Sequence, residues 1–272
     1  MTTAQRVIKY LAIALAIILI ALIISGIVST ATRIIGFFAP DTGNGETAVY
    51  DFAGEDIRAL EIDVEAAELT VSVGETLYVE CTSSRVNVKL VGSTLTVVEE
   101  EAFFHKTDAY KLNVTLPDVM LTEADISTGA GKLTLKGLST ERLELDLGAG
   151  ESDISGLTVS RSADVDGGAG RISIKESLIT SLEFDMGIGE VDISAALSGD
   201  NDLDCGVGDL DLELIGVKDS YSVRASKGIG SFTVNGSSVS DGETLGSGDI
   251  KVNIDSGVGS VRVTLVEQLD EN

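Results

Sequence analysis

Hydrophobic and polar residues alternate along most of the chain beyond residue 50. In the first clear run, Leu60, Ile62 and Val64 alternate with Glu61 and Asp63. An alternation with a period of two places the apolar side chains on one face of a strand and the polar ones on the other. Apolar positions with a helical period do not recur in this part of the chain. The pattern therefore predicts an all-β fold of half-buried strands.

A Gly-x-Gly motif recurs seven times between residues 129 and 259. Its first five copies are spaced by 19, 20, 19 and 19 residues, and the next two gaps, of 22 and 29 residues, contain insertions. A fixed period of this length is typical of solenoids, in which each repeat forms one coil of a stack. Glycine suits the corners of such coils because it adopts backbone angles that β-branched residues avoid. The predicted structural corners are formed by Gly129, Gly131, Gly148, Gly150, Gly168, Gly170, Gly187, Gly189, Gly206, Gly208, Gly228, Gly230, Gly257 and Gly259.

Apolar residues occupy fixed places around each corner. Counted from the first glycine, they stand three residues before it, between the two glycines, and four and six residues after it. We expect all four columns to point inward, so that each repeat supplies one short strand on either side of its corner. Leucines at the second turn of the coil are expected to point inward as well. The residues between the glycines are Ala130, Ala149, Ala169, Ile188, Val207, Ile229 and Val258, and the leucines are Leu138, Leu157, Leu178 and Leu197.

These patterns predict a single-stacked parallel β-solenoid, β-helix-like, with about 19–20 residues per coil over residues 125–266. Residues 51–124 alternate less regularly and are expected to form a β-rich cap, in which residues 62–67 look like a copy of the repeat without its glycines. The insertion at 235–249 is rich in Gly and Ser and is expected to be a plain loop. We expect the last coil to expose a strand edge, which the acidic tail, residues 267–272, would shield.

The N-terminal region has a different pattern. Residues 10–28 form a nineteen-residue apolar run without a charge, and a helix of that length spans a bilayer. We expect a transmembrane signal-anchor helix at 10–32, between a cytoplasmic tail at 1–9 and an extracytoplasmic juxtamembrane linker at 33–50. The basic residues of the tail keep the N-terminus inside the cell. A cleaved signal peptide is the alternative, because small residues that resemble a cleavage site follow the apolar run.

Charge divides the chain into two parts. The net charge is −25, from 44 acidic and 19 basic residues. Residues 1–33 contain three basic residues and no acidic one, so they carry +3 and the remainder carries −28. A surface of that charge repels the phosphates of nucleic acids. Nucleic acid is therefore excluded as a partner, and we expect the partner to be an envelope protein or a component of the cell wall.

Acidic residues recur at fixed places on the predicted outer face. On neighbouring coils their carboxylates would stack and repel one another. Calcium is the candidate counter-ion because it binds six to eight oxygens, and a face screened by water and salt is the alternative. The chain lacks the Asp and the nine-residue period of the calcium-binding nonapeptide repeat. No other cofactor is expected. The candidate ligands two residues before the corner are Asp146, Asp166, Asp185 and Asp204, followed by Asp255. A second column four residues before the corner contains Glu144, Asp164, Glu183 and Asp202, and a third column five residues after it contains Asp153, Asp192 and Asp211. We expect the three columns to form one acidic wall.

The residues that could perform catalysis are these carboxylates, two cysteines and one histidine. Some parallel β-helices cleave acidic polysaccharides with grouped carboxylates, but here the grouping recurs along a whole column and no neighbouring base singles one out. Cys81, Cys205 and His105 are too few for a zinc site, and we expect both cysteines to be buried free thiols. The chain is therefore predicted not to be an enzyme, with a polysaccharide-active β-helix enzyme as the competing hypothesis.

Two features together resemble a known family. Alternating strands such as Leu60-Glu61-Ile62-Asp63-Val64 lead to a strand at 110–117, and Gly-Ala-Gly, Gly-Ile-Gly and Gly-Val-Gly corners follow. This arrangement, over about residues 51–265, is similar to the bacterial β-strand-repeat domains of unknown function catalogued as "putative adhesins". The resemblance implies a surface scaffold behind a membrane segment, without catalytic residues. It also implies an alternative function, as a regulatory accessory protein of a system that senses stress in the cell envelope.

Overall fold

The computed structural model describes residues 47–100 and 110–267. These residues form an all-β structure, as predicted, in which 16 strands belong to one hydrogen-bonded sheet and a single short 3-10 turn covers Lys218–Ser220. Among them no helix is long and apolar enough to cross a bilayer. The predicted cytoplasmic tail, the anchor helix, most of the linker, His105 and most of the acidic tail lie outside the described residues.

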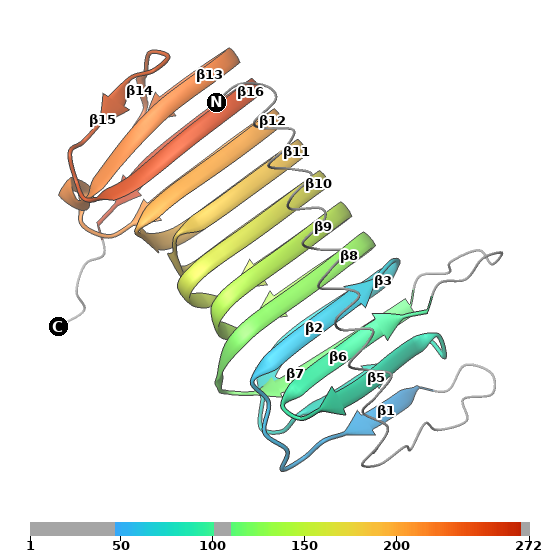
Figure 1. Cartoon of the computed structure of the whole chain (residues 1–272). Helices are drawn as coiled ribbons and strands as arrows, with labels where there is room; N and C mark the ends of the chain where they lie inside the picture. Colours follow the sequence, from blue (N-terminus) through green and yellow to red (C-terminus); the bar gives the residue numbers. More distant parts are fainter. Residues whose placement is uncertain (1–46, 101–109, 268–272) are drawn as a thin grey trace, which may run out of the picture. The chain divides into compact units, whose positions relative to one another are not determined.

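Seven long strands stack side by side in parallel (Figure 1). In neighbouring strands the corners lie in register, so that Asp166 lies beside both Asp146 and Asp185, although 20 and 19 residues separate them along the chain. Over the first five of these strands, the chain therefore returns to within one strand spacing after each repeat. The seven strands are β8 (Met120–Lys136), β9 (Ser139–Ser155), β10 (Thr158–Thr180), β11 (Leu182–Ser198), β12 (Asp200–Ile215), β13 (Tyr221–Val234) and β16 (Ile250–Val266).

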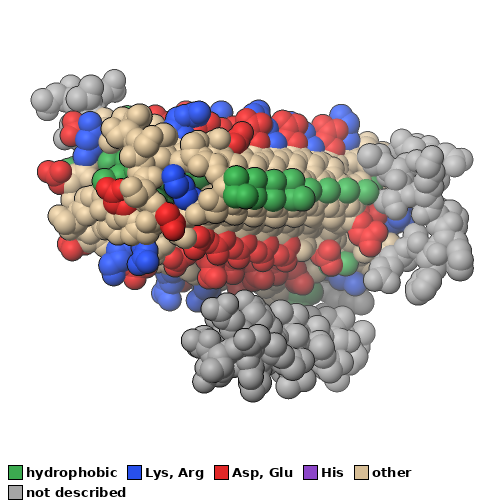
Figure 2. Space-filling model, turned by 90° about the horizontal axis from the view of Figure 1, so that it is seen from above, with side chains coloured by type: hydrophobic (Ala, Val, Ile, Leu, Met, Phe, Trp, Pro, Cys, Tyr) green, Lys and Arg blue, Asp and Glu red, His purple; other side chains and the backbone are tan. Residues whose placement is uncertain are grey.

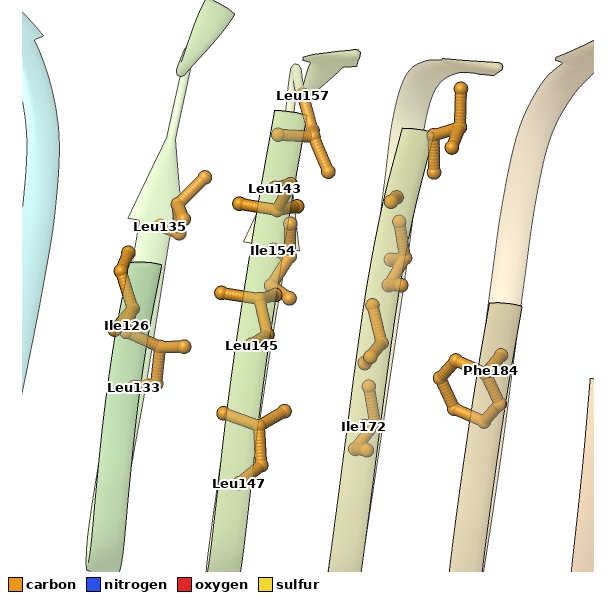
Figure 3. Close-up of a cluster of buried hydrophobic side chains, with 14 of the residues drawn as sticks. Ile126, Leu133, Leu135, Leu143, Leu145, Leu147, Ile154, Leu157, Ile172 and Phe184 are labelled. Carbon is orange, nitrogen blue, oxygen red and sulfur yellow. The ribbon is translucent and has the colours of Figure 1, made fainter. Parts of the chain in front are cut away.

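Each long strand has two limbs, one before and one after its glycine corner, and the core lies between them. The columns three residues before, four residues after and six residues after the first glycine are buried in every repeat, as predicted. In Figure 3 the aliphatic side chains of neighbouring strands, such as Leu145 of β9 and Ile126 of β8, form successive layers along the stack. These side chains belong to a single hydrophobic cluster that also includes Phe184 and Phe232.

The residues between the glycines point outward, contrary to the prediction. Ile188 and Ile229 are 61% and 75% exposed. At the corner the alternation of the strand breaks, because the second glycine has a positive φ, such as 143° at Gly208. The last buried side chain before the corner, such as Cys205, and the first one after it, such as Leu210, are therefore separated by four outward positions.

Leu178 is also exposed, contrary to the prediction, whereas the other three second-turn leucines are buried. The cause is one extra residue in β10. The pairing of β10 with β11 shifts between Ile174 and Ser177, where Glu176 has a φ of 51°. The shift moves Ile179, which pairs with Leu197, to the inner face and turns Leu178 outward.

The N-terminal end of the stack continues the repeat and then changes to antiparallel pairing. β2 and β3 pair in parallel with the two limbs of β8, so Ile62 lies beside Ile126 and the degenerate repeat has the expected position. The strands that follow pair partly in antiparallel fashion, as in the hairpin of β5 with β6. The elements of this end are β1 (Ala48–Asp51), β2 (Ala59–Val64), β3 (Ala67–Gly74), β4 (Tyr78–Cys81), β5 (Val86–Val91), β6 (Thr94–Glu99) and β7 (Tyr110–Pro117).

One buried carboxylate joins three segments at this end. Glu99 accepts hydrogen bonds from the Tyr110 hydroxyl at 2.8 Å and from the Glu65 amide at 2.9 Å. Its other carboxylate oxygen lies 2.8 Å from a guanidinium nitrogen of Arg85. The Glu99 side chain is 2% exposed, so these partners replace the water that the charge has lost.

The C-terminal end differs from the prediction in two respects. The last long strand, β16, lies between β12 and β13, so β13 and not β16 is the terminal long strand. The insertion expected to be a plain loop contains β14 (Ser237–Ser238) and β15 (Thr244–Leu245), which pair in antiparallel fashion with β13. The insertion therefore covers part of the edge of β13.

Candidate functional site

The outward residues of the corners form a continuous row, which we call the apolar ridge. In stack order it consists of Ala130, Ala149, Ala169, Ile188, Val207, Val258 and Ile229, each paired in register with the next. Figure 2 shows the ridge as a straight row along the molecule. Its last four members are β-branched, and 45–75% of each is exposed. Exposed aliphatic side chains in an uninterrupted row indicate a contact surface.

The glycines that flank the ridge are required by the close stacking of the corners. A Cβ at Gly150 would overlap the carbonyl oxygen of Gly131 in the neighbouring strand, and a Cβ at Gly208 would overlap that of Gly189. Because the corners stack backbone on backbone, the residue between the glycines carries the only side chain there. The corner glycines are thus structural, and they leave the ridge bordered by bare backbone.

One flank of the ridge consists of two acidic columns on the limbs before the corners, which together we call the acidic wall. The four candidate aspartates of the sequence analysis lie in one column, each beside the next. Sequence reasoning missed Glu61 and Asp125 of the outer column. Asp125 stands four residues before Gly129, so its place in the repeat could have revealed it. Glu61 precedes no Gly-x-Gly corner, but the resemblance of residues 62–67 to the repeat could have revealed it. The inner column contains Asp146, Asp166, Asp185, Asp204 and Asp255, and the outer column contains Glu61, Asp125, Glu144, Asp164, Glu183 and Asp202.

The wall carboxylates stack on one another without basic partners from the described part of the chain. None of the eleven forms an ion pair with a Lys or Arg of residues 47–100 or 110–267. Three of them accept hydrogen bonds from neutral side chains, of which the shortest, 2.8 Å, comes from the Asn253 amide to Asp202. Partial burial, followed by the neighbouring carboxylates, raises the pKa of Asp125 and of Asp164 to about 6. The same two causes raise the pKa values of Glu144, Asp166 and Asp204.

The other flank of the ridge, which we call the paired flank, has the opposite arrangement. It contains the third predicted acidic column, which lies on the limbs after the corners and, contrary to the prediction, not in one wall with the other two columns. There Lys132 lies 2.7 Å from Asp153 of the next strand, and Arg171 forms ion pairs with Glu190 and Asp192. Further along the stack Arg262 pairs with Asp211. In Figure 2 acidic and basic side chains mix on this side of the ridge, whereas acidic side chains alone form the band on the other. The repeat can therefore neutralise its stacked carboxylates, and on the wall it does not.

A groove runs between the wall and the ridge, because the corner glycines have no side chains to fill it. Its larger part has a volume of about 650 Å³, and the inner column without Asp146 lines it together with Met186, Cys205, Lys227 and Asp241. A second part, of about 450 Å³, extends toward the N-terminal end and shares Asp166 with the first. The groove offers carboxylates along one side and backbone on its floor.

The remaining candidate residues do not form a reaction centre within the described part of the chain. No three of its His, Cys, Asp and Glu residues are grouped so as to hold a metal ion. Cys81 and Cys205 are buried free thiols, as predicted. Burial, together with Asp204 and Asp185, raises the pKa of the Cys205 thiol to about 11, so it is protonated at neutral pH.

Comparisons with known proteins identify the family of the chain. Residues 57–254 match the family described as Toastrack DUF4097. No curated protein matches the chain. Similar solved structures include a "putative cell adhesion protein" from Clostridium sporogenes, with 15% identity and a TM-score of 0.33 over 81% of this chain and 99% of that one. Two others come from Parabacteroides distasonis. One, a "putative adhesin", has 14% identity and a TM-score of 0.36 over 81% and 98% of the two chains, and the other, a "putative lipid binding protein", has 15% and 0.31 over 81% and 98%.

Proposed function

Because the chain belongs to the Toastrack DUF4097 family, we propose that it is an adhesin-like scaffold that binds a partner and catalyses no reaction. The observation that carries the proposal is the difference in charge pairing between the two flanks of the apolar ridge. Lys and Arg pair with carboxylates on one flank of the apolar ridge, whereas no Lys or Arg among the described residues pairs with a carboxylate of the acidic wall. Stacked carboxylates that repel one another are suited to bind a positively charged partner, which relieves the repulsion.

The proposal includes the architecture and the placement of the chain. The stack is a single parallel β-solenoid, and its rigid rows hold the wall and the ridge at a fixed spacing. Residues 10–32 anchor the chain in the cell membrane with the N-terminus in the cytoplasm, and residues 33–50 connect the anchor to the extracytoplasmic stack. The partner is an envelope protein or a component of the cell wall.

Two observations favour a binding function over a catalytic one. Wall carboxylates occupy equivalent positions in successive strands, and the two whose pKa values are raised to about 6, Asp125 and Asp164, form no ion pair with a Lys or Arg of the described residues that would single out either as a catalytic group. The Cys205 thiol at the groove is buried and protonated, whereas a nucleophilic cysteine needs a lowered pKa.

Photo-crosslinking in intact cells tests this function. A photoreactive residue in place of Asp185 reports on the wall, and one in place of Asp192, on the paired flank of the same strand, is the matched control. We expect discrete adducts with an envelope protein or with wall polymer from position 185 and much weaker adducts from position 192. Equal adduct patterns from both positions, or none above background, would contradict the proposal.

A further inference from the structure

We infer that the apolar ridge and the acidic wall together form a docking site for a basic amphipathic α-helix of a partner protein. The inference rests on the proposed binding function and names the chemistry of the partner. The helix lies along the stack, with its apolar stripe on Ile188, Val207, Val258 and Ile229 and its Lys and Arg side chains over the inner column of the wall.

The β-branched half of the ridge is not required by the fold. The same corner position is filled by alanine in the three preceding repeats, Ala130, Ala149 and Ala169, with the same flanking glycines and the same pairing. Side chains at this position are exposed in all seven repeats. The larger aliphatic groups therefore contribute contact area on the outside and no packing on the inside.

The insertion of β16 makes this row continuous. Val258 belongs to the last strand of the sequence, yet it pairs in register with Val207 on one side and with Ile229 on the other. Four β-branched side chains thus follow one another without a gap, beside the larger part of the groove, which Asp166, Asp185, Asp204 and Asp255 line.

The charge beside the ridge favours a cationic partner over a second copy of the chain or an anionic bilayer. The chain beyond residue 33 carries −28, so a second copy or an anionic bilayer would bring like charges against the wall. A cationic partner instead supplies the counter-charges that the wall lacks, and the glycine-floored groove has room for the stems of Lys and Arg beside the ridge.

The spacing of the ridge selects a helix over an extended strand. Neighbouring strands lie about 4.8 Å apart, so four consecutive ridge residues span about 14 Å. Helix positions i, i+3, i+7 and i+10 span about 15 Å, whereas four same-face positions of an extended strand span about 20 Å. A helical stripe therefore stays in step with the ridge over its whole β-branched half, and a strand does not.

The test uses the full chain in phosphatidylcholine nanodiscs and a fluorescent designed helix of about 21 residues, long enough for the full row of wall and ridge. The peptide has leucine at the stripe positions and lysine along one flank, and anisotropy measures its binding against empty nanodiscs. A scrambled peptide of the same composition and a peptide with glutamate in place of lysine are the controls. We expect saturable binding of the designed helix that weakens at high salt, and at least about tenfold weaker binding of both controls.

Variants of the apolar ridge and of the acidic wall test whether the helix binds there. The combined change Ile188→Ala, Val207→Ala, Val258→Ala and Ile229→Ala should weaken binding at least about tenfold, while the melting temperature stays close to that of the parent chain because alanine already fits the corner. Neutralising the wall with Asp166→Asn, Asp185→Asn and Asp204→Asn should weaken binding similarly. The matched control removes the same charge from the paired flank with Glu151→Gln, Glu190→Gln and Asp211→Asn, and should have little effect.

Three results would overturn the inference. They are equal binding of the designed and scrambled peptides, unchanged binding by the folded ridge variant, and self-association of the chain that the ridge variant abolishes. If crosslinks from position 185 persist in cells while the designed helix does not bind, the inference fails and the proposed function stands. If the helix binds but no crosslinks form in cells, the proposed function loses its cellular support.

Discussion

Three consecutive residues at each corner obey different constraints. Gly206 and Gly208 face the backbone of the neighbouring strand, and Gly208 also has a φ of 143°. Val207, between them, faces outward. The motif therefore combines two positions that tolerate only glycine with one that tolerates many side chains.

The change Gly208→Ala is expected to destabilise the protein by at least about 2 kcal/mol, because the new Cβ strains the backbone and separates the strands. Urea unfolding followed by circular dichroism measures the effect. The neighbouring change Val207→Ala is the control and should stay within about 0.5 kcal/mol of the parent protein. Similar unfolding midpoints for both variants would show that the corners do not need glycine.

Glu99 is the buried acceptor on which the Tyr110 hydroxyl depends. The change Glu99→Ala leaves that hydroxyl without its acceptor and Arg85, whose side chain is 28% exposed, without its counter-charge, and should cost about 1–3 kcal/mol of stability. Denaturant unfolding again measures the effect, with Glu100→Ala as the control because Glu100 is exposed. A loss below about 1 kcal/mol would indicate that water enters and replaces the missing carboxylate.

At the scale of the strand, the sequence predicted the inner faces well and the corners poorly. Period-two alternation identified buried columns such as Ile126, Leu145 and Phe184, because burial on one face imposes that pattern directly. The prediction that the ridge residues point inward is wrong, because an apolar residue at a corner gives the same sequence pattern whether its side chain points inward or outward. Only the φ of the second glycine, which the sequence does not encode as a pattern, decides the direction.

The sequence predicted the acidic columns of the candidate site but not the pairing of their charges. The acidic columns are visible as a repeat, and the four candidate aspartates do lie together. Their difference from the paired flank depends on which Lys or Arg reaches across to the next strand, as Arg171 does to Glu190. Such contacts follow from strand register and from the length of the side chain, and they have no sequence motif of their own.

The wall predicts an unusual pH dependence of stability. Burial and neighbouring carboxylates raise the folded-state pKa of Asp125 and Asp164 to about 6, above the ordinary value of 3.8. The folded state therefore binds more protons than the unfolded state between about pH 4 and pH 6, and this contribution to stability increases as the pH falls through that window. Since both groups are half exposed, we expect a gain of about 1 kcal/mol or less from each.

Thermal unfolding between about pH 7 and pH 4.5 checks this sign. The change Asp164→Asn should raise the melting temperature at pH 7 and flatten its dependence on pH. Asp211→Asn is the matched control, because it removes a carboxylate that pairs with Arg262 and should not raise the melting temperature. A parent protein that only loses stability on acidification, with no improvement from Asp164→Asn, would contradict the expected repulsion.

At the scale of the whole stack, the order of the strands differs from their order in the sequence. β16 supplies the hydrogen-bonding partner of two strands, because its residues pair with β12 along one edge and with β13 along the other. Four of its side chains, Val252, Ile254, Val261 and Val263, are buried in the common core. The last part of the sequence is therefore an interior part of the structure.

A chain that stops after Gly248 should lose more than about 10 °C in melting temperature and become sensitive to protease, because two strand edges and their core are left uncovered. A stop after Glu267, which retains β16, is the control. A synthetic peptide of residues 250–266 added in trans should restore resistance, and a scrambled peptide should not. Equal stability of the two truncated chains would show that β13 can dock directly on β12.

The position of β16 also sets an order of events during protein synthesis. Strands β8 to β12 can stack as they leave the ribosome, each on the one before it. β13 cannot take its final place in the same way, because the strand that belongs beside it is translated later. Until β16 is translated, the nascent chain has an open position one strand wide between β12 and β13, which a chaperone can shield or the corresponding strand of another nascent chain can fill. The seven-stranded stack is thus completed by the insertion of β16 between β12 and β13. A translation product that is interrupted before β16 keeps this position open.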